Sequence, residues 1–254
     1  MKQFMQQYFI ETAEQKAKNF VIAGADAHHI MKVMRMRIGD NIRLVVNEQE
    51  LYLCSIVEMN MEEKTVIVEQ QQQLKGDVEL PVKVTVVLGM LKSDKFDYAV
   101  QKMTELGVHQ IIPWQAEFSI VKIHANNEIK KINRWQTIAK EAAEQSKRLV
   151  IPHITAPQKL SDIIETISDN AKIFVAYENL AELETKKLIF DKNDKEIYVF
   201  IGSEGGISPQ EIRYLQEQQK HDINFVSLGK RILRAETAAI FAMSLCTGVY
   251  EGLI

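Results

Sequence analysis

The segment IGSEGGIS, residues 201–208, restricts the possible fold classes more than any other stretch of the chain. It follows an apolar run, Glu196–Ile201, that predicts a strand, and it ends at Ser208, a good helix N-cap with proline next and Glu211 three residues on. Its three glycines allow positive φ and a close approach of the backbone to a ligand. The segment lacks the Lys-Ser/Thr of a P-loop and the G-x-G-x-x-G spacing of a dinucleotide site. It therefore predicts either a ligand loop at a strand end of an α/β fold or a plain tight turn.

A second loop of the same kind begins the segment LGKRILRAETAAIFAMSL, residues 228–245. It also follows a predicted strand and leads into a helix rich in alanine and isoleucine. Three cations, Lys230, Arg231 and Arg234, alternate with apolar side chains before that helix. Such a loop fits phosphate contact or the wall of an apolar cofactor site, and a solvated basic turn is the alternative. We expect the two loops to lie beside each other.

The apolar runs around these loops indicate an α/β domain with a mostly parallel sheet, because from Pro81 onward short strands alternate with amphipathic helices. The predicted strands are Lys83–Leu88, Gln110–Trp114, Ala171–Ala176, Glu196–Ile201 and Ile223–Leu228. Helical spacing of apolar residues is clearest at 96–106 and 132–143. The charged side of the helix at 134–148 is either a solvated face or a polar face turned towards a substrate groove.

The first part of the chain has a different pattern, which is typical of a small β-rich domain. Its predicted strands are Gln3–Ile10, Asn41–Val46, Leu51–Met59 and Lys64–Glu69. One helix with an apolar face interrupts them and begins after Asp26 as its N-cap. The polar run Gln70–Lys75 predicts a linker. We therefore expect a β domain over residues 1–73 and an α/β domain over residues 74–254.

The first domain also carries the densest basic cluster of the chain. The cluster consists of Lys32, Arg35, Arg37 and Arg43, together with His28 and His29. Asp40 is the single acid nearby in the sequence. This balance predicts a surface that holds RNA phosphates, and an inert solvated cluster is the alternative.

The composition is that of a globular protein of 254 residues. Hydrophobic residues make up 46% and charged residues 26%, which excludes collagen-like, low-complexity and mostly disordered classes. Cys54 and Cys246 are the only cysteines and the histidines lack metal-ligand spacing, so we expect no disulfide framework and no metal site. No apolar run approaches the ~20 residues of a membrane span, and the N-terminus lacks the apolar core of a signal peptide. We expect a cytoplasmic protein.

Five segments carry a resemblance to a known family. They are AHHIMKVMRMRIGD (27–40), LKSDKFDYAVQKMTELGV (91–108), RWQTIAKEAAEQSKR (134–148), IGSEGGIS (201–208) and LGKRILRAETA (228–238). In this order and spacing, they resemble the RsmE family of 16S rRNA (uracil-N3) methyltransferases over nearly the whole chain. The resemblance implies an N-terminal PUA-like β-barrel, a SPOUT-superfamily α/β domain with a deep trefoil knot, and a homodimer. It also implies S-adenosylmethionine as methyl donor and a uridine near the 3′ end of 16S rRNA, in the small ribosomal subunit, as target.

The same resemblance implies that the two loops form the knot around the cofactor, with the chain after Ala176 as a third wall. The cofactor-binding residues that it implies are Glu178, Gly202, Ser203, Glu204, Gly205, Gly206, Leu228, Gly229, Ile232 and Leu233. We expect Lys230 and Arg231 to join the basic cluster of the first domain in binding RNA.

Methylation at N3 of a uridine requires an unpaired or flipped base and stabilisation of the negative charge that spreads onto O2 and O4. Our hypothesis is that Arg234 provides this stabilisation, because only arginine offers a permanently charged fork of donors there. Glu141 is our candidate for the proton acceptor, and Glu204 and Glu236 stay open as alternatives.

The chain departs from the family at three positions. Many members carry arginine where this chain has Gln7 and Phe118, so two cations that would serve RNA are absent. Many members also have proline where Ser203 stands. These departures favour, as the alternative function, a diverged paralogue that acts as a non-catalytic RNA-binding or ribosome-assembly factor or methylates another RNA site. A nucleotide-dependent enzyme on small molecules is a more distant alternative, because phosphate-binding motifs are missing.

Overall fold

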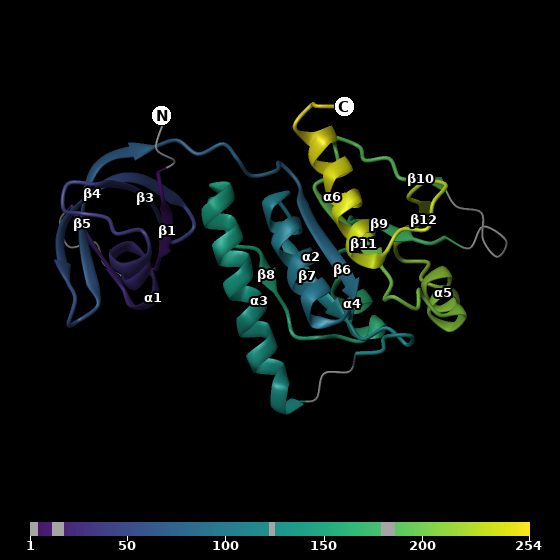
Figure 1. Cartoon of the computed structure of the whole chain (residues 1–254). Coiled ribbons are helices and arrows are strands. Elements are labelled where there is room, and N and C mark those ends of the chain that lie inside the picture. The colour runs from purple at the N-terminus through teal and green to yellow at the C-terminus, as the bar shows by residue number, and fades with distance from the viewer. Residues whose placement is uncertain (1–4, 12–17, 122–124, 179–185) are drawn as a thin grey trace. The chain divides into compact units, whose positions relative to one another are not determined.

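The structure is a computed structural model that describes residues 5–11, 18–121, 125–178 and 186–254 (Figure 1). The side chains of Ser93, Ala125 and Asn126 lie outside the description. The chain divides into two compact units. The first unit contains Met1–Glu79 and Ala143–Val150, and the second contains Leu80–Ala142 and Ile151–Ile254.

The first unit is built on a five-stranded sheet. Its order is β1 (Gln7–Ile10), β3 (Asn41–Val46), β4 (Glu50–Asn60), β5 (Thr65–Leu74) and β2 (Asn19–Ala23). β1 pairs with β3 in parallel, and the other neighbours are antiparallel. Alternating apolar residues of β3, β4 and β5 form its core together with Ala27 and Ile30, which come from the helical stretch between β2 and β3. The β-rich prediction for this part of the chain is confirmed.

Two local predictions in this unit are wrong. The polar run predicted as a linker starts as a strand, because β5 continues to Leu74, where it pairs with Leu51 of β4. Backbone hydrogen bonds to β4 hold this end of β5, and the glutamine side chains lie largely outside the core. The polar sequence therefore does not show the apolar alternation that would predict a strand. Helix α1 (Gly24–His28) begins after Ala23 rather than after Asp26. Asp26 lies in the first turn of the helix, where its negative charge interacts favourably with the helix dipole. A π-helical segment, η1 (His29–Val33), follows directly.

The second unit contains a seven-stranded sheet in which every described pair is parallel. Its order is β10 (Lys186–Lys187), β12 (Asp222–Ser227), β9 (Lys172–Ala176), β11 (Glu196–Ile201), β6 (Lys83–Gly89), β7 (Gln110–Trp114) and β8 (His153–Ile154). The five predicted strands are all present, within one residue of their expected ends. A parallel sheet buried on both faces explains why these segments are nearly continuous apolar runs.

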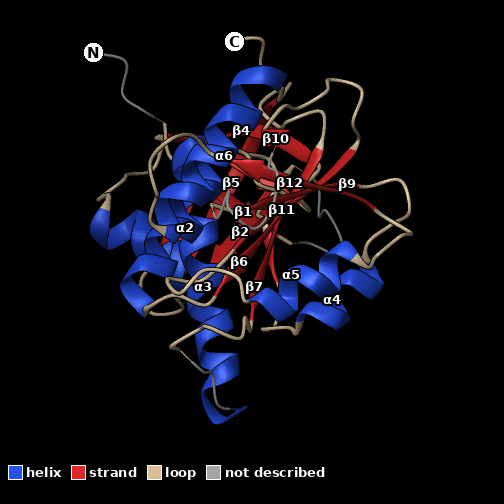
Figure 2. Cartoon of the chain, turned by 90° about the vertical axis from the view of Figure 1, so that its right-hand side faces the viewer, coloured by secondary structure: helices blue, strands red, loops and turns tan. Residues whose placement is uncertain are grey.

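Helices cover both faces of this sheet (Figure 2). On one face, α2 (Ser93–Glu105), α3 (Ala125–Ser146) and α6 (Ala235–Tyr250) share a core cluster with Val84, Val86 and Leu88 of β6. On the other face, α4 (Leu160–Thr166) and α5 (Pro209–Gln216) share a second cluster with Val87. Within the described chain, none of the helices is both long and apolar enough to cross a membrane.

The register of the sheet brings three strand ends into one row. Ala176 at the end of β9 stands opposite Ile201 of β11 and Val226 of β12. The loops that follow these strands therefore leave the sheet at the same edge. In parallel sheets, this carboxyl edge is where ligands bind.

Both cysteines are buried, which leads to a prediction about their reactivity. Burial raises the pKa of the Cys54 thiol and of the Cys246 thiol to about 12. Because the thiolate is the reactive form, only about one thiol in ten thousand is ionised at pH 8. We expect a thiol reagent at pH 8 to leave the folded protein unmodified and to label both cysteines after unfolding in guanidinium. Rapid labelling of the native protein would contradict the burial of these side chains.

Candidate functional site

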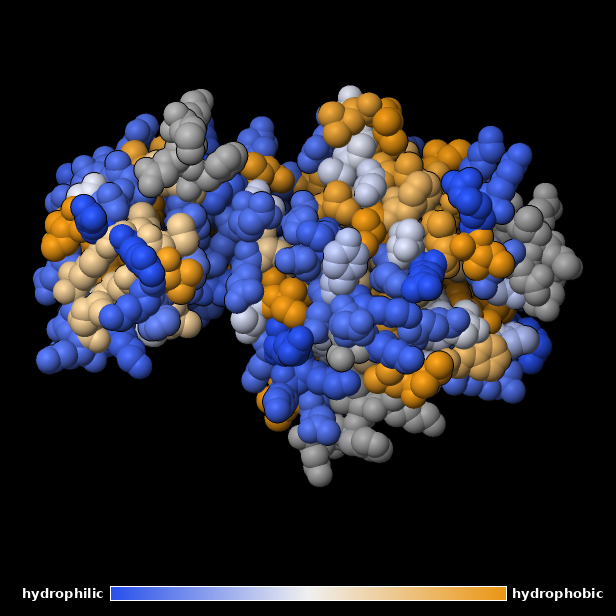
Figure 3. All heavy atoms as spheres, viewed as in Figure 1, coloured by the Kyte–Doolittle hydropathy of each residue, from blue (hydrophilic) through white to orange (hydrophobic). Residues whose placement is uncertain are grey.

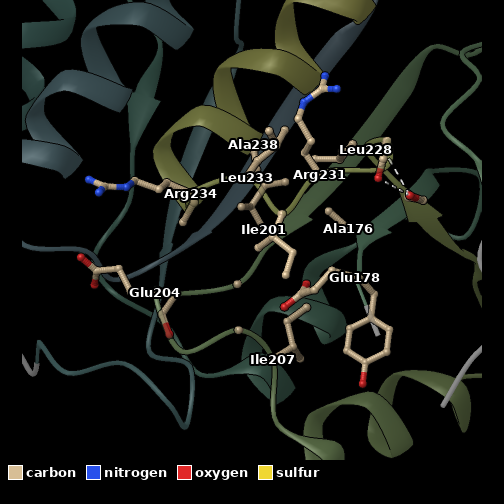
Figure 4. A pocket seen from close by; sticks show the side chains of 18 of the residues that line it. Ala176, Glu178, Ile201, Glu204, Ile207, Leu228, Arg231, Leu233, Arg234 and Ala238 are labelled. Carbon is tan, nitrogen blue, oxygen red and sulfur yellow. Dashed lines mark hydrogen bonds between the residues drawn. The ribbon is translucent and has the colours of Figure 1, made fainter. Parts of the chain in front are cut away.

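A cavity of about 360 Å³ opens at the carboxyl edge of the second unit's sheet (Figure 4). Three loops surround it, one after each of β9, β11 and β12. Its walls combine apolar side chains with a few charged groups at the rim. The apolar lining residues are Ala176, Ile201, Ile207, Leu228, Ile232, Leu233, Ala235 and Ala238.

The loop after β11 depends on glycine at two positions. Gly206 has a φ of 79°, and its N–H donates to the Ser203 carbonyl at 2.9 Å, which closes the turn. A Cβ at Gly202 would lie 2.8 Å from the backbone carbon of Gly206, so only glycine fits there. The Ser208 side chain then caps α5 and forms a capping box with Glu211, as the sequence predicts.

The loop after β12 ends at the first turn of α6. Ser227 holds its start, because the hydroxyl accepts a hydrogen bond from the Gly229 N–H at 3.2 Å, and Gly229 has a φ of 116°. Arg234 is the N-cap residue of α6, and its carbonyl accepts from the Ala238 N–H at 2.8 Å. The helix thus fixes the backbone of Arg234 at the cavity while its side chain stays exposed.

Glu178 supplies a carboxylate from the short stretch after β9. A Cβ placed on Gly206 would lie 3.4 Å from Glu178 Oε1, so this carboxylate faces the glycine turn across the cavity. Figure 4 shows the carboxylate of Glu178 near Ile207, below the apolar centre of the cavity. Residues 179–185, which follow in the sequence, lie outside the described residues.

A charged pair at the rim joins a loop residue to α2. Lys95 Nζ lies 2.7 Å from Glu204 Oε1, and both residues border the cavity. This hydrogen bond to a carboxylate raises the pKa of Lys95. Arg234 lies on the same side of the cavity as Glu204, whereas the Arg231 side chain extends away from them (Figure 4).

The structure brings most of the residues singled out from the sequence to this one cavity. Those that line it are Glu178, Gly202, Ser203, Glu204, Gly206, Leu228, Gly229, Arg231, Ile232, Leu233 and Arg234. Gly205, Lys230 and Glu141 are exposed and do not line it. Gly205 instead approaches Phe118, since a Cβ on it would lie 2.8 Å from the Phe118 Cβ.

Lys95 and Gly89 are among the residues of the site that sequence reasoning did not single out. Lys95 lies in the segment 91–108, which is predicted to be helical. Helical periodicity identifies only the apolar residues of such a segment, and Lys95 is not one of them. Gly89 ends β6, and a Cβ on it would lie 2.3 Å from the Ser203 nitrogen, so the loop after β11 rests directly on its backbone. A glycine that closes an apolar strand is a sequence signal for close backbone approach.

The basic cluster of the first unit does not lie in one kind of environment. Lys32, Arg35 and Arg37 are exposed. Arg43, on β3, is partly buried, and desolvation lowers the pKa of its guanidinium. Gln7 is buried, with its Nε2 donating to the Arg148 carbonyl at 2.6 Å. This glutamine therefore replaces no exposed cation: its position lies inside the unit, against the segment 143–150.

Comparison with known protein families matches residues 78–247, well over half of the chain, to an RNA methyltransferase domain. The chain belongs to this RNA methyltransferase family. Residues 22–69 of this methyltransferase also match an RNA methyltransferase PUA domain. The expected fold class, an α/β methyltransferase domain with an N-terminal PUA-like domain, is thus confirmed. The threading of the two loops as a trefoil knot stays a prediction.

Two curated relatives of the methyltransferase match most of its length. The ribosomal RNA small subunit methyltransferase E of Bacillus subtilis (strain 168) is 36% identical over 248 residues, covering 94% of this chain and 95% of that protein. The protein of the same name from Mesomycoplasma hyopneumoniae (strain 232) is 31% identical over 242 residues, covering 95% and 99%.

Two solved structures agree with the fold of the methyltransferase. The ribosomal RNA small subunit methyltransferase E of Neisseria gonorrhoeae, bound to S-adenosyl methionine, has a TM-score of 0.85, with 25% identity over 97% of this chain and 98% of that one. A methyltransferase of Legionella pneumophila in complex with the same cofactor has a TM-score of 0.85, with 27% identity over 96% and 97%.

The cavity of the methyltransferase fits S-adenosylmethionine by the chemistry of its own walls. The buried hydroxyl of Ser203 has no hydrogen-bond partner among the described residues, so it is available to a ligand. At Gly206 a Cβ would meet Glu178 Oε1 at 3.4 Å, so the absence of a side chain there leaves room for a ligand next to this carboxylate. Apolar side chains suit an adenine ring and methylene groups, and the Glu178 carboxylate suits hydroxyl or ammonium donors.

Proposed function

We propose that this methyltransferase transfers a methyl group from S-adenosylmethionine to N3 of one uridine near the 3′ end of 16S rRNA in the small ribosomal subunit. The observation that carries the proposal is the cavity at the carboxyl edge, where two glycine loops and Glu178 meet beside Arg234. The full-length similarity to two proteins named ribosomal RNA small subunit methyltransferase E supports the same substrate.

The residues around the cavity suit this chemistry. When bound, S-adenosylmethionine supplies an electrophilic methyl group on a sulfonium. Transfer forms the bond from N3 to the methyl carbon, breaks the bond from that carbon to sulfur, and releases the N3 proton to a base. The apolar walls position the reactants and limit water, while Arg234 at the rim offers donors to the charge that develops on O2 and O4 of the base.

The proton acceptor is proposed among three carboxylates. Glu141 is exposed on α3, away from the cavity's lining, so its use requires the substrate or another subunit to bring the base to it. Glu204 is at the rim but is paired with Lys95. Glu236, in the first turn of α6, also lies outside the cavity's lining, but its charge acts on Lys95 at the rim, and its buried Oε2 has no hydrogen-bond partner in the described part of the chain. This unpaired oxygen makes Glu236 the better supported base.

The proposal divides the work between the two parts of the chain. The first unit is the RNA-binding part, and the second unit is the methyltransferase part, which acts in the cytoplasm. The second unit dimerises with another copy, and Ile232, which is 84% exposed beside the cavity, is a candidate contact for that copy. Lys230 and Arg231, both exposed on the same loop, bind RNA phosphates.

A methyl-transfer assay tests the proposed function. Purified protein is incubated with tritiated S-adenosylmethionine and small subunits that lack the native modification, and mass spectrometry locates the labelled base. Label at N3 of a single uridine is the expected result. Cofactor binding by calorimetry without any label would contradict it and would favour the non-catalytic RNA-binding factor, while label at another base would favour a different RNA target.

The basic cluster leads to a prediction about salt. Replacing Lys32 and Arg37 together with glutamine removes two exposed cations, so fewer counterions are released on binding. We expect weaker binding of single-stranded RNA and a slope of log K against log salt that is shallower by about 1.4. Filter binding between low and moderate salt measures the slope. The matched control is Lys192→Gln with Lys195→Gln, two exposed lysines of the second unit, for which the slope should stay the same.

A further inference from the structure

The first unit contains a cavity of its own, about 370 Å³ in volume, that shares no residue with the site described above. It is enclosed by the chain before β1 and by the loop between η1 and β3. The lining residues are Met5, Gln6, Met34, Arg35, Met36, Gly39, Asp40 and Asn41. A cavity of this size is large enough for a small planar ligand.

The loop that forms this cavity is held mainly by hydrogen bonds of its backbone. Met36 N–H donates to the Ile30 carbonyl at 3.1 Å, and Gly39 N–H donates to the Ile56 carbonyl at 2.8 Å. Arg37 N–H donates to Asp40 Oδ2 at 2.7 Å. Of the lining side chains, Asp40 thus helps to hold the loop through one carboxylate oxygen, and the backbone hydrogen bonds provide the rest of a fixed frame.

Arg35 is the most unusual residue of this frame. Its φ of 52° is in the left-handed region, which a residue with a Cβ adopts at a cost. Within the described part of the chain, its guanidinium has neither a hydrogen-bond partner nor an ion-pair partner. A strained backbone that presents a charged, planar and unpaired group to a cavity is a sign of ligand binding.

The chemistry of the lining suits a nucleobase. Methionine thioethers make favourable contacts with aromatic rings, and a guanidinium plane stacks on a base. The Asp40 carboxylate accepts N–H donors and has one oxygen beyond the one used by Arg37. Guanine presents such donors on adjacent ring and amino nitrogens.

The surroundings of the cavity favour RNA over a protein partner. Lys32 and Arg37 are exposed next to it in the sequence, and with Arg35 they outnumber the single acid. Strongly hydrophilic and apolar residues alternate over the region of α1 on the visible face of the first unit (Figure 3). Sites for single-stranded RNA typically combine cations that contact the phosphates with an apolar surface on which a base stacks.

We propose that this cavity binds one unpaired nucleobase of the RNA, with guanine preferred. The base stacks on the Arg35 guanidinium and the methionine side chains, its donor edge faces Asp40, and the adjoining phosphates lie on Lys32 and Arg37. This inference rests on the proposed function, because it assumes that the substrate is RNA. It assigns the first unit a role in choosing a base as well as in holding phosphates.

Nuclear magnetic resonance of methionine methyl groups tests whether a base enters the cavity. The full-length protein, labelled at its methionine methyls and saturated with S-adenosylhomocysteine to block the other site, is titrated with guanosine 5′-monophosphate or ribose 5-phosphate. A stacked base shifts nearby methyl resonances through its ring current. We expect shifts for Met34 and Met36 with the nucleotide only, and none for Met61, which lies in the turn between β4 and β5. Equal shifts with both compounds, or none, would overturn the proposal.

A pair of matched variants tests the role of Arg35. Arg35→Asn removes the guanidinium and keeps a residue that tolerates positive φ. Lys64→Asn makes the corresponding change at another exposed cation of the same unit, with a φ of 51°, outside the cavity. We expect Arg35→Asn to weaken binding of a guanosine-containing single-stranded RNA by about 10-fold or more, and Lys64→Asn to change it by less than about 2-fold. Equal effects of the two variants would reduce Arg35 to a general phosphate contact.

A third variant tests the preference for guanine. Asp40→Asn keeps an oxygen for the Arg37 N–H but removes the negative charge. The variant should bind guanosine and uridine monophosphates equally, whereas the wild-type protein should prefer the former. An unchanged preference would refute the role of Asp40. Because labelling of small subunits is measured separately, loss of the base pocket and failure of methyl transfer give different results.

Discussion

Replacing Gly89 with alanine is expected to lower the affinity for S-adenosylmethionine until no binding is detected, and to destabilise the second unit. The new Cβ would lie 2.3 Å from the Ser203 nitrogen and 2.7 Å from the Gly202 carbonyl carbon. Both atoms belong to the backbone of the loop after β11, which cannot rotate out of the way as the end of a side chain does. Over-packing of this kind costs about 1–3 kcal/mol in stability, and the displaced loop no longer matches the cofactor. Thermal unfolding and calorimetry with S-adenosylmethionine measure the two effects.

The control for this variant is Gly248→Ala. Gly248 lies in α6, and a Cβ there would meet only Ile254 side-chain atoms, the nearest at 3.0 Å. Alanine favours a helix more than glycine does, so we expect unchanged or slightly higher stability and normal cofactor affinity. If Gly89→Ala bound the cofactor as well as Gly248→Ala did, the close contact between Gly89 and the loop would not position the site.

Replacing Arg234 with alanine is expected to lower the rate of methyl transfer by about 100-fold or more while leaving cofactor affinity within a few-fold. The backbone of Arg234 caps α6, and its side chain is exposed at the cavity, so the substitution removes donors without disturbing packing. Loss of charge stabilisation affects the chemical step, because the charge on the uridine develops only during transfer. Single-turnover transfer from labelled S-adenosylmethionine measures this step.

Arg213→Ala is the control for Arg234→Ala. Arg213 is an exposed arginine of α5 that does not line the cavity, so transfer should proceed at the normal rate. Arg234→Lys keeps a charge without the planar fork of donors and should give an intermediate rate. A normal rate for Arg234→Ala in a folded protein that still binds the cofactor would refute the proposed role of Arg234.

Features that depend on neighbours in the sequence are predicted well. The strand at Glu196–Ile201 and the capping box of Ser208 and Glu211 occur at their predicted residues. The predictions that failed concern residues whose type fits two local structures equally well, so the sequence pattern does not choose between them. Gln70 to Leu74 is polar enough for a linker, yet pairing with β4 makes it a strand. Asp26 is a good N-cap by type, but the helix begins earlier, after Ala23.

The sequence alone determined the five longer strands of the second unit, the two glycine loops and the resemblance to a methyltransferase family, because hydrophobic periodicity and motif spacing are properties of the chain itself. Only the tertiary structure decided which residues meet. Lys95 reaches Glu204, Gly89 supports Ser203, and Gln7 is buried. Contacts between residues far apart in the chain depend on strand order and register, which a single sequence does not encode locally.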